Sequence, residues 1–438
     1  MARGTDISVR NQIIYSVYIR NHTEEGTFRA LIPDLPRIRA LGADIIWLMP
    51  IHPIGVKGKK GSLGCPYANR DYRAVNPDYG TMEDFKALVD AIHALGMKCI
   101  IDVVYNHTSP DAVLTEEHPE FYYRKPNGSF GNKTAEWTDV IDLDYSVPAL
   151  WEYQTETLKM WAKIVDGFRC DVASCVPVGF WKQARAEVAK VNPDCLWLGE
   201  TVHGTFNLMN RVERRKGCWA DSDSEMYEAF DIEYDYDIRE AFDLYIEGKA
   251  PLSLWLSLLN HQEVVFPDHY SKLRCLENHD RPRAKFLWPE KAALENATAM
   301  LYFLKGTVML YAGQEFACKT IPSLFEKDVF PRDTGVDLSD SLARLAKLRK
   351  EVLSAEDYFF ATADDRNNIA VCLRDDGKRK KVGIFSLSGN PAEVSLCYPN
   401  GERMGIPDGS YENLPDGRSI EVRENSVRTD GEPILFCC

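Results

Sequence analysis

The sequence lacks the features by which membrane, secreted and nucleic-acid-binding proteins are recognised. No stretch approaches the run of about 20 apolar residues that a membrane-spanning helix needs. The first twelve residues, MARGTDISVRNQ, contain no apolar core of a secretory signal. Acidic residues outnumber basic ones by 66 to 52, and the net charge of -14 argues against nucleic acid and anionic membranes as partners. We therefore expect a soluble cytoplasmic protein, and its ligands could be neutral molecules such as sugars.

Cysteine spacings typical of metal sites are also missing. The chain has 12 cysteines, but no two of them form a CxxC arrangement. Cys99, Cys170, Cys195 and Cys275 lie inside or beside apolar runs, where cysteine behaves as a small buried apolar residue. We expect free thiols, which are typical of a reducing compartment.

The sequence does contain four short apolar runs that each end in a carboxylate with polar neighbours. Runs of this length are typical of strands buried on both faces. A buried strand that stops at an acid delivers that acid to one edge of a sheet, so four of them predict a shared pocket of carboxylates. The runs are CIIDVVYNHT with Asp102, Asn106 and His107, IVDGFRCDVA with Arg169 and Asp171, CLWLGE with Glu200, and KLRCLENHD with His279 and Asp280.

Strand-like runs alternate with helix-like stretches through most of the chain. Eight strand–helix units predict an α/β fold, a closed (β/α)₈ TIM barrel of parallel strands. An open doubly wound sheet would show the same alternation, but the number of units and the acids at many strand ends favour the barrel. Residues 27–41 and 238–259 are each expected to form one helix.

Two segments depart from this alternation. The 40 residues 109–148 follow the third strand, and an insertion of that length in a compact fold is usually functional. Beyond residue 354, short strand-like pieces separated by turn sequences predict a small antiparallel β domain. We expect a catalytic barrel over residues 1–108 and 149–354, an inserted domain over 109–148 and a C-terminal β-sandwich domain over 355–438.

Asp171 and Glu200 are the natural pair for glycosidic cleavage, which needs two carboxyl groups beside the anomeric carbon. They end consecutive strand units, so their side chains should converge at one rim. Arg169 lies two residues before Asp171 on the same side of the strand and would keep that carboxylate ionised, as a nucleophile requires. Glu200 follows Leu-Trp-Leu-Gly, and an apolar surround would favour its protonated form, as a general acid requires.

These segments resemble the signature regions of the α-amylase family of retaining glycoside hydrolases. DVVYNH resembles the family's first region and GFRCD the second, and ENHD resembles the region of its third carboxylate. The segments LGADIIWLMP, YANRDYRAVNPDYGT, IDLDY and GTVMLYAGQE add further matches in the same order along the barrel. The resemblance implies that Asp171 is the nucleophile with Arg169 as its partner, Glu200 the acid/base, and Asp280 the carboxylate that stabilises the transition state.

The resemblance also implies the residues that bind the sugar. His107 and His279 would hydrogen-bond the sugar at the cleavage site, and Tyr67 would form an aromatic platform beneath it. Asn106 matches a ligand of the family's calcium-bound members. We nevertheless predict that no cofactor or metal is required, and that Asn106 braces the third strand against the inserted segment. Calcium stays possible, with oxygen atoms of Asp139, Asp142 and Asp144 as further candidate ligands.

The sequence departs from the family pattern after the nucleophile. Many family amylases have Lys-His three and four residues past it, where this chain has Ser174 and Cys175. This difference favours short or unusual α-glucosides over ordinary endo-acting starch cleavage.

Trp137 in the inserted segment could stack on a sugar or belong to that segment's own small core.

We expect a hydrolase that cleaves α-glucosidic bonds of maltodextrins or related α-glucan oligosaccharides through a covalent glycosyl-enzyme intermediate. A transglycosylase or trehalose-forming enzyme of the same family would use the same three carboxylates and pass the glycosyl group to a sugar instead of water. A non-catalytic carbohydrate-binding paralogue would be expected to have lost a carboxylate, and this chain has all three.

Overall fold

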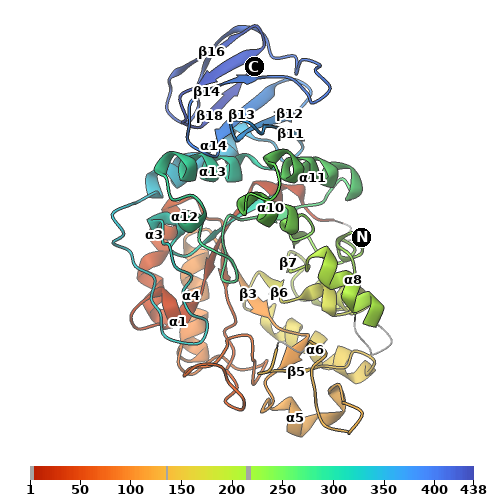
Figure 1. Ribbon diagram of the computed structural model, residues 1–438. Coiled ribbons are helices and arrows are strands. Elements are labelled where there is room, and N and C mark those ends of the chain that lie inside the picture. The colour runs from red at the N-terminus through yellow and green to blue at the C-terminus, as the bar shows by residue number, and fades with distance from the viewer. Residues whose placement is uncertain (1–3, 135–136, 214–218) are drawn as a thin grey trace. The chain divides into compact units, whose positions relative to one another are not determined.

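The computed structural model describes residues 4–134, 137–213 and 219–438 (Figure 1). Eight parallel strands form a closed barrel in the order β1-β10-β9-β8-β7-β6-β3-β2, which confirms the predicted fold class. The chain divides into two compact units, the first mainly of residues 14–237 and 322–330 and the second mainly of residues 238–321 and 331–438. The barrel strands are β1 (Ile13–Val17), β2 (Ile45–Leu48), β3 (Lys98–Val103), β6 (Gly167–Cys170), β7 (Leu196–Gly199), β8 (Ile232–Tyr234), β9 (Lys272–Arg274) and β10 (Thr307–Tyr311).

The strands of the first unit are short and almost entirely buried. Every residue of β6 and β7 is buried, as expected for parallel strands covered on both faces. Gly167 is the first residue of β6 and lies beside Leu196 of β7. A Cβ at position 167 would lie 2.3 Å from the carbonyl oxygen of Leu196. Glycine is therefore required there, and it lets β6 and β7 pair at their normal spacing.

Capping residues and prolines determine where helices of the first unit begin. Thr81 and Asp84 form a capping box at the start of α4. The single helix predicted over residues 27–41 is wrong. The segment is divided into α2, η2 and α3, because Pro33 and Pro36 lie in the first turns of η2 and α3 and proline fits a first turn but not a helix interior. The helices are α1 (Ile19–His22), α2 (Phe28–Leu31), η2 (Ile32–Asp34), α3 (Leu35–Ala40), α4 (Met82–Ala94), α5 (Leu114–Glu117), η3 (Pro119–Phe121), α6 (Pro148–Trp161), η4 (Ala173–Cys175), α7 (Val178–Val188), α8 (Gly204–Glu213) and α9 (Asp223–Met226).

The single helix predicted over residues 238–259 is also wrong, because the second unit has two helices there. Gly248 lies between them at a φ of +70°, a left-handed conformation typical of helix ends. Pro251 then stands at the N-cap of the next helix. The helices of the second unit are η1 (Ile7–Asn11), α10 (Arg239–Ile246), α11 (Leu252–Val265), α12 (Ala284–Leu287), α13 (Lys291–Phe303), η6 (Gln314–Phe316) and α14 (Ser339–Val352).

The end of the chain forms the predicted antiparallel β structure. Two four-stranded sheets, β11-β12-β13-β18 and β14-β17-β16-β15, share one apolar core that includes Ile384, Val422 and Phe436. The turn-rich stretch after Tyr398 supplies three of these strands, β15, β16 and β17. The strands are β11 (Tyr358–Asp364), β12 (Ile369–Asp375), β13 (Lys380–Ser386), β14 (Ala392–Ser395), β15 (Gly409–Glu412), β16 (Ser419–Arg423), β17 (Ser426–Thr429) and β18 (Ile434–Cys437).

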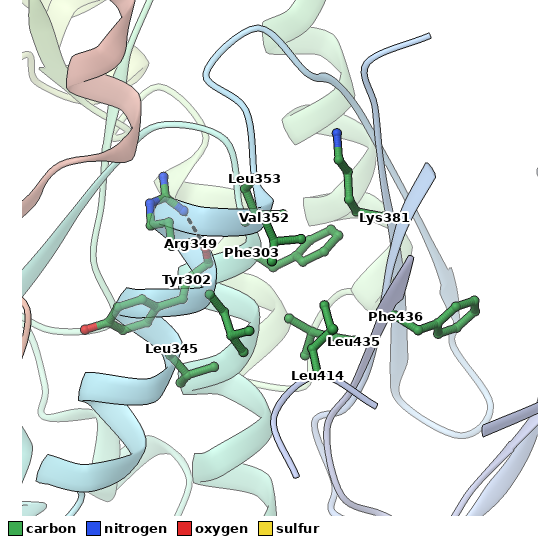
Figure 2. Close-up of a pocket in the computed structure, with 11 residues that line it drawn as sticks. Tyr302, Phe303, Leu345, Arg349, Val352, Leu353, Lys381, Leu414, Leu435 and Phe436 are labelled. Carbon is green, nitrogen blue, oxygen red and sulfur yellow. Dashed lines mark hydrogen bonds between the residues drawn. The ribbon is translucent and has the colours of Figure 1, made fainter. Parts of the chain in front are cut away.

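Helices α13 and α14 pack against these strands within the second unit. Figure 2 shows the apolar side chains at this junction, among them Phe303, Leu345 and Leu435 around a small pocket. Its cavity volume is about 10 Å³, so it holds one water molecule at most. Arg349 of α14 donates hydrogen bonds to the backbone oxygens of Tyr302 and, at 2.9 Å, Leu304, and so joins α14 to the end of α13. Arg374 of β12 donates to the Phe303 carbonyl at 3.2 Å, so close packing and this buried side chain tie the C-terminal sheet to α13.

Within the described residues, no helix has the length and apolar character needed to cross a membrane. The described cysteines, including the adjacent Cys437 and Cys438, are free thiols. Cys218 lies outside the described residues.

Asp357 is fully buried and joins two cations of the C-terminal sheet. Its carboxylate lies 3.1 Å from Arg374 Nε and 2.6 Å from Lys381 Nζ. Asp357→Asn would remove this counter-charge from both buried cations, which we expect to cost about 3–5 kcal/mol of unfolding free energy. The urea midpoint of the second unit should therefore fall. Glu393→Gln, on an exposed position of β14, should leave the midpoint unchanged, and an equal midpoint in both variants would contradict this account.

Candidate active site

Strand register brings two of the predicted catalytic carboxylates to the same level. β6 pairs with β7 so that Cys170 lies beside Gly199. Asp171 and Glu200 directly follow the last residues of β6 and β7. The Glu200 N–H donates to the Cys170 carbonyl at 2.9 Å, which continues the pairing of the two strands by one residue. The two acids therefore stand side by side at the carboxyl ends of neighbouring strands, where active sites of (β/α)₈ barrels lie.

One buried guanidinium, that of Arg169, joins carboxylates from three strands. Its Nη1 donates to both oxygens of Asp102, at 2.9 and 3.0 Å, and to Asp171 Oδ1 at 2.9 Å. Its Nη2 lies 2.7 Å from Glu200 Oε2. Arg169 is 0% exposed, so these carboxylates take the place of water as the partners of its charge. We call these four residues the Arg169 cluster.

Three aromatic rings surround the same guanidinium. Arg169 Cζ lies 5.1 Å from the ring centre of Trp47, 5.4 Å from that of Tyr234 and 5.6 Å from that of Tyr67, within the range of cation–π contacts. Burial opposes the charged form, but the neighbouring carboxylates outweigh it and raise the pKa of Arg169 well above its usual range. Arg169 is therefore a fixed positive charge beneath the candidate site.

Glu200 has a second donor, the backbone N–H of Val172, at 2.9 Å from its Oε2. Val172 adopts a left-handed conformation, with φ 35° and ψ 46°, which is rare for a β-branched residue and costs about 1–3 kcal/mol. This conformation, directly after Asp171, aims the N–H at Glu200. The expectation of an apolar surround for the Glu200 carboxyl is wrong, because its partners are a guanidinium and an N–H, which stabilise the ionised form.

Tyr67 and His107 lie beside the Asp102 part of the Arg169 cluster. The Tyr67 hydroxyl donates to Asp102 Oδ2 at 3.1 Å. His107, in β4 (His107–Thr108), interacts with the backbone of Tyr67, and burial lowers the pKa of His107 below its usual 6.5. It is therefore neutral at pH 7 and can donate one hydrogen bond and accept another. Tyr67 thus contacts the Arg169 cluster directly, and His107 contacts Tyr67.

His279 and Asp280 belong to the second unit, in the loop that follows β9. His279 is buried, and its Nε2 lies 3.0 Å from Asp280 Oδ2. The Asp280 side chain is 46% exposed, so its carboxylate can meet a ligand. Its convergence with Asp171 and Glu200 stays a prediction.

The inserted segment meets the candidate site through Trp137. β4 pairs with β5 (Ile141–Asp142) in a two-stranded sheet beside the third barrel strand. The Trp137 ring lies 5.3 Å from the His107 ring and stacks on Phe206 of α8 at 6.3 Å between centres. Trp137 therefore packs between His107 and the helix that follows Glu200, and does not lie only against its own segment.

The candidate calcium ligands of this segment are engaged by other groups. Asp139 pairs with Lys60 Nζ at 2.9 Å, and Asp144 accepts the Ser146 N–H at 3.0 Å. Burial raises the pKa of Asp142 above its usual range. Calcium needs about six to eight oxygen ligands, and among the residues with described positions no group of three or more His, Cys, Asp or Glu could hold a metal ion. The three candidate aspartates thus have protein groups as partners, and an enzyme that needs no calcium stays a prediction.

Asn106 does brace the inserted segment, but through its backbone. Its carbonyl accepts the Leu143 N–H at 3.0 Å, while its side-chain amide lies 3.1 Å from His107 Nδ1. The side chain therefore orients the histidine.

Ser174 and Cys175 lie in the short helix η4 and contact neighbouring segments of the first unit. Ser174 is fully buried, and its carbonyl accepts the Asp221 N–H at 3.1 Å. Cys175 Sγ accepts from Asn210 Nδ2 of α8 at 3.7 Å. Neither residue supplies a positive charge at the position where many family amylases have Lys-His.

Sequence analysis placed Asp102 in the predicted pocket of carboxylates but gave it no role in the reaction, and it did not single out Trp47 or Tyr234. The pattern of an acid near the end of a buried strand is therefore sufficient to find Asp102. Trp47 and Tyr234 carry no such signal, because an aromatic residue in a buried strand is ordinary core composition.

Comparison with known proteins identifies related chains. The family model described as "Alpha amylase, catalytic domain" matches residues 12–350, and "Bacterial Alpha amylase C-terminal domain" matches residues 360–436. The crystal structure of an alpha-amylase from Lactobacillus plantarum is 40% identical with a TM-score of 0.92, over 99% of this chain and 100% of that one. A noncanonic maltogenic alpha-amylase from Thermotoga neapolitana is 32% identical with a TM-score of 0.85, over 98% of this chain and 99% of that one.

A curated relative, the alpha-amylase MalA of Haloarcula japonica, is 29% identical over 316 residues, which are 70% of this chain and 44% of that protein. The match thus spans less than half the length of that relative. The catalytic-domain model nevertheless covers most of this chain, and the likeness to the L. plantarum structure extends over its full length. This protein belongs to the alpha-amylase family.

Proposed function

We propose that the protein is a glycoside hydrolase that cleaves α-glucosidic bonds of maltodextrins and related α-glucan oligosaccharides with retention of configuration. The observation that supports this most is the Arg169 cluster, in which Asp171 and Glu200 share one buried guanidinium. Glycosidic cleavage needs two carboxyl groups at one rim. The two alpha-amylases that are similar over nearly the whole chain support the same chemistry.

In the first step, Asp171 attacks the anomeric carbon while Glu200 gives a proton to the departing glycosidic oxygen. The carbon–oxygen bond to the leaving sugar breaks as the bond to Asp171 forms. Arg169 Nη1 holds the attacking carboxylate in place and stabilises its negative charge before attack. The Val172 N–H orients the Glu200 carboxyl toward its neighbour.

In the second step, water attacks the same carbon and Glu200, now a carboxylate, accepts a proton from it. The bond to Asp171 breaks, and its negative charge returns to Arg169. Each step inverts the anomeric carbon, so two steps restore the original configuration. The contacts of Glu200 with Arg169 and Val172 suit this step, because they stabilise the ionised form that acts as the base.

Four further residues bind the sugar in this proposal. Tyr67 supplies an aromatic face, and neutral His107 gives a hydrogen bond to a hydroxyl. His279 and Asp280 come from the second unit, and the exposed carboxylate of Asp280 binds sugar hydroxyls as the ring flattens in the transition state.

The uncharged residues after the nucleophile favour short substrates. Ser174 and Cys175 are uncharged and offer no cation to a sugar on the leaving-group side. If a sugar in place of water accepted the glycosyl group, the protein would be a transglycosylase or a trehalose-forming enzyme. Chromatography of the products from maltotriose, maltoheptaose, trehalose and sucrose separates these activities, and no turnover of any of them would indicate a carbohydrate-binding paralogue.

We also propose that the protein works in the cytoplasm without calcium. Free thiols, including the adjacent Cys437 and Cys438, are typical of a reducing compartment. The Lys60 ammonium supplies the positive charge next to Asp139 that a cation would otherwise provide.

The roles of the two carboxylates can be separated with an activated substrate. Glu200→Gln should lower turnover of maltotriose by about 10²–10⁴-fold, while an aryl α-glucoside with a good leaving group needs no proton and should recover its first step. Asp171→Asn should be inactive on both substrates, because no nucleophile remains. The measurement is the burst of phenol released from the aryl glucoside in stopped-flow kinetics. An equal loss on both substrates in Glu200→Gln would remove its assignment as the acid.

The first product should carry the α configuration. Direct attack by Asp171 corresponds to a carboxyl separation of about 5–5.5 Å, whereas an inverting enzyme needs about 6.5–9.5 Å for an intervening water. Proton NMR of the product, recorded before mutarotation, decides between them, and an initial β-anomer would overturn the proposal of retention.

Calcium removal should leave activity and the thermal midpoint unchanged. The protein is dialysed exhaustively against EDTA and measured with and without calcium added back, with magnesium as the control ion. A large loss that calcium restores and magnesium does not would show that a calcium site exists.

A further inference from the structure

The loop that carries Asp280 is closed at its base by one buried ion pair. Arg283 Nη1 lies 2.5 Å from Glu277 Oε1, and both side chains are essentially inaccessible to solvent. The other carboxylate oxygen, Glu277 Oε2, accepts the Ala284 N–H at 2.6 Å. The single carboxylate of Glu277, which precedes residues 278–282, therefore binds the two residues that follow them and holds both ends of the loop together.

The same arginine ties the loop to the next strand of the barrel. Arg283 Nη2 donates to the Ala312 carbonyl at 3.1 Å, and its Nε donates to the Thr320 carbonyl at 3.2 Å. Its guanidinium also lies 4.5 Å from the ring centre of Tyr311, the last residue of β10. The planar guanidinium thus spans the loop after β9 and the segment after β10, a geometry that lysine cannot reproduce.

Inside the loop, local hydrogen bonds leave the Asp280 carboxylate accessible. Asn278 is fully buried, and its Oδ1 accepts the Asp280 N–H at 2.9 Å. The Asp280 side chain stays 46% exposed. The loop therefore joins a fully buried base to one accessible carboxylate.

We propose that Glu277 and Arg283 are positioning residues for Asp280: their ion pair sets the place of the third carboxylate relative to the reacting sugar. This rests on the proposed function, in which Asp280 acts on the transition state. Neither residue touches the substrate. Their contribution is the fixed placement of a group whose displacement by about 1 Å can cost up to about 10²-fold in rate.

The test compares single and double variants on maltotriose. Glu277→Gln keeps an acceptor for the Ala284 N–H but removes the charge that holds Arg283, and Arg283→Lys keeps a charge but loses the bridging hydrogen bonds. We expect each to lower kcat by about 10- to 10²-fold with little change in KM, with a far-ultraviolet circular dichroism spectrum like that of the parent protein. If Glu277→Gln does not fold, the comparison uses Arg283→Lys.

A double-mutant cycle distinguishes positioning from general stability. In an Asp280→Asn background, Glu277→Gln should have little further effect on kcat, because the group that it positions is already disabled. Full additivity of the two losses would overturn the proposal. If Asp280→Asn alone kept full activity, the proposed role of Asp280 would fail instead, and the two failures are thus separate.

A second buried ion pair, at the opposite end of β10, provides a matched control. Glu263 pairs with Lys305 at 2.8 Å, and both side chains are largely buried. Lys305 precedes the start of β10, whereas Arg283 binds beyond its end. Glu263→Gln should lower the urea midpoint and leave kcat unchanged, and an equal fall of kcat in this control would show that the loss in Glu277→Gln reports stability alone.

Discussion

A buried guanidinium cannot remain charged without close compensation, and this constraint organises the candidate site. Arg169 is held by Asp102, Asp171 and Glu200 from three neighbouring strands and is enclosed by three aromatic rings. Three carboxylates share this one cation, so removal of Arg169 would leave them buried side by side without a counter-charge. The acids that the reaction needs therefore depend on the arginine, and the chemistry and the stability of this region share the same groups.

The cluster also explains a strained backbone beside it. Val172 is left-handed although it is β-branched, and its N–H is thereby directed at Glu200. Such a conformation persists where the surrounding structure over-determines it. Here the surroundings are the pairing of β6 with β7, the close approach at Gly167 and the fixed position of Arg169. The strain is located at the residue between the candidate nucleophile and the turn that carries Ser174 and Cys175.

The second unit relies on the same type of interaction in different surroundings. Arg349, Arg374 and Arg283 are all buried. Arg349 donates to backbone carbonyls, and burial lowers its pKa well below the usual range. Arg374 and Arg283 each have a buried carboxylate partner. A guanidinium has five donors in a rigid plane, so one side chain can fix several segments at once. In this unit arginine joins helices to the C-terminal sheet and closes the loop of Asp280.

The sequence by itself determined the barrel and the antiparallel C-terminal sheets, because alternating strands and helices and short strands separated by turns have local signatures. It also placed Asp171 and Glu200 at the ends of consecutive strands, whereas Tyr67 and His107 were chosen from the resemblance to the α-amylase family, and the roles of these four residues stay predictions. It did not determine where long helices break, since the effects of Pro33, Pro36 and Gly248 depend on the direction that the chain must take. It also missed Trp47 and Tyr234, whose pattern is that of ordinary core. The surroundings of Glu200 were predicted as apolar and are ionic. Only the tertiary structure decided this, because the guanidinium that Glu200 meets comes from another strand, 31 positions earlier in the chain.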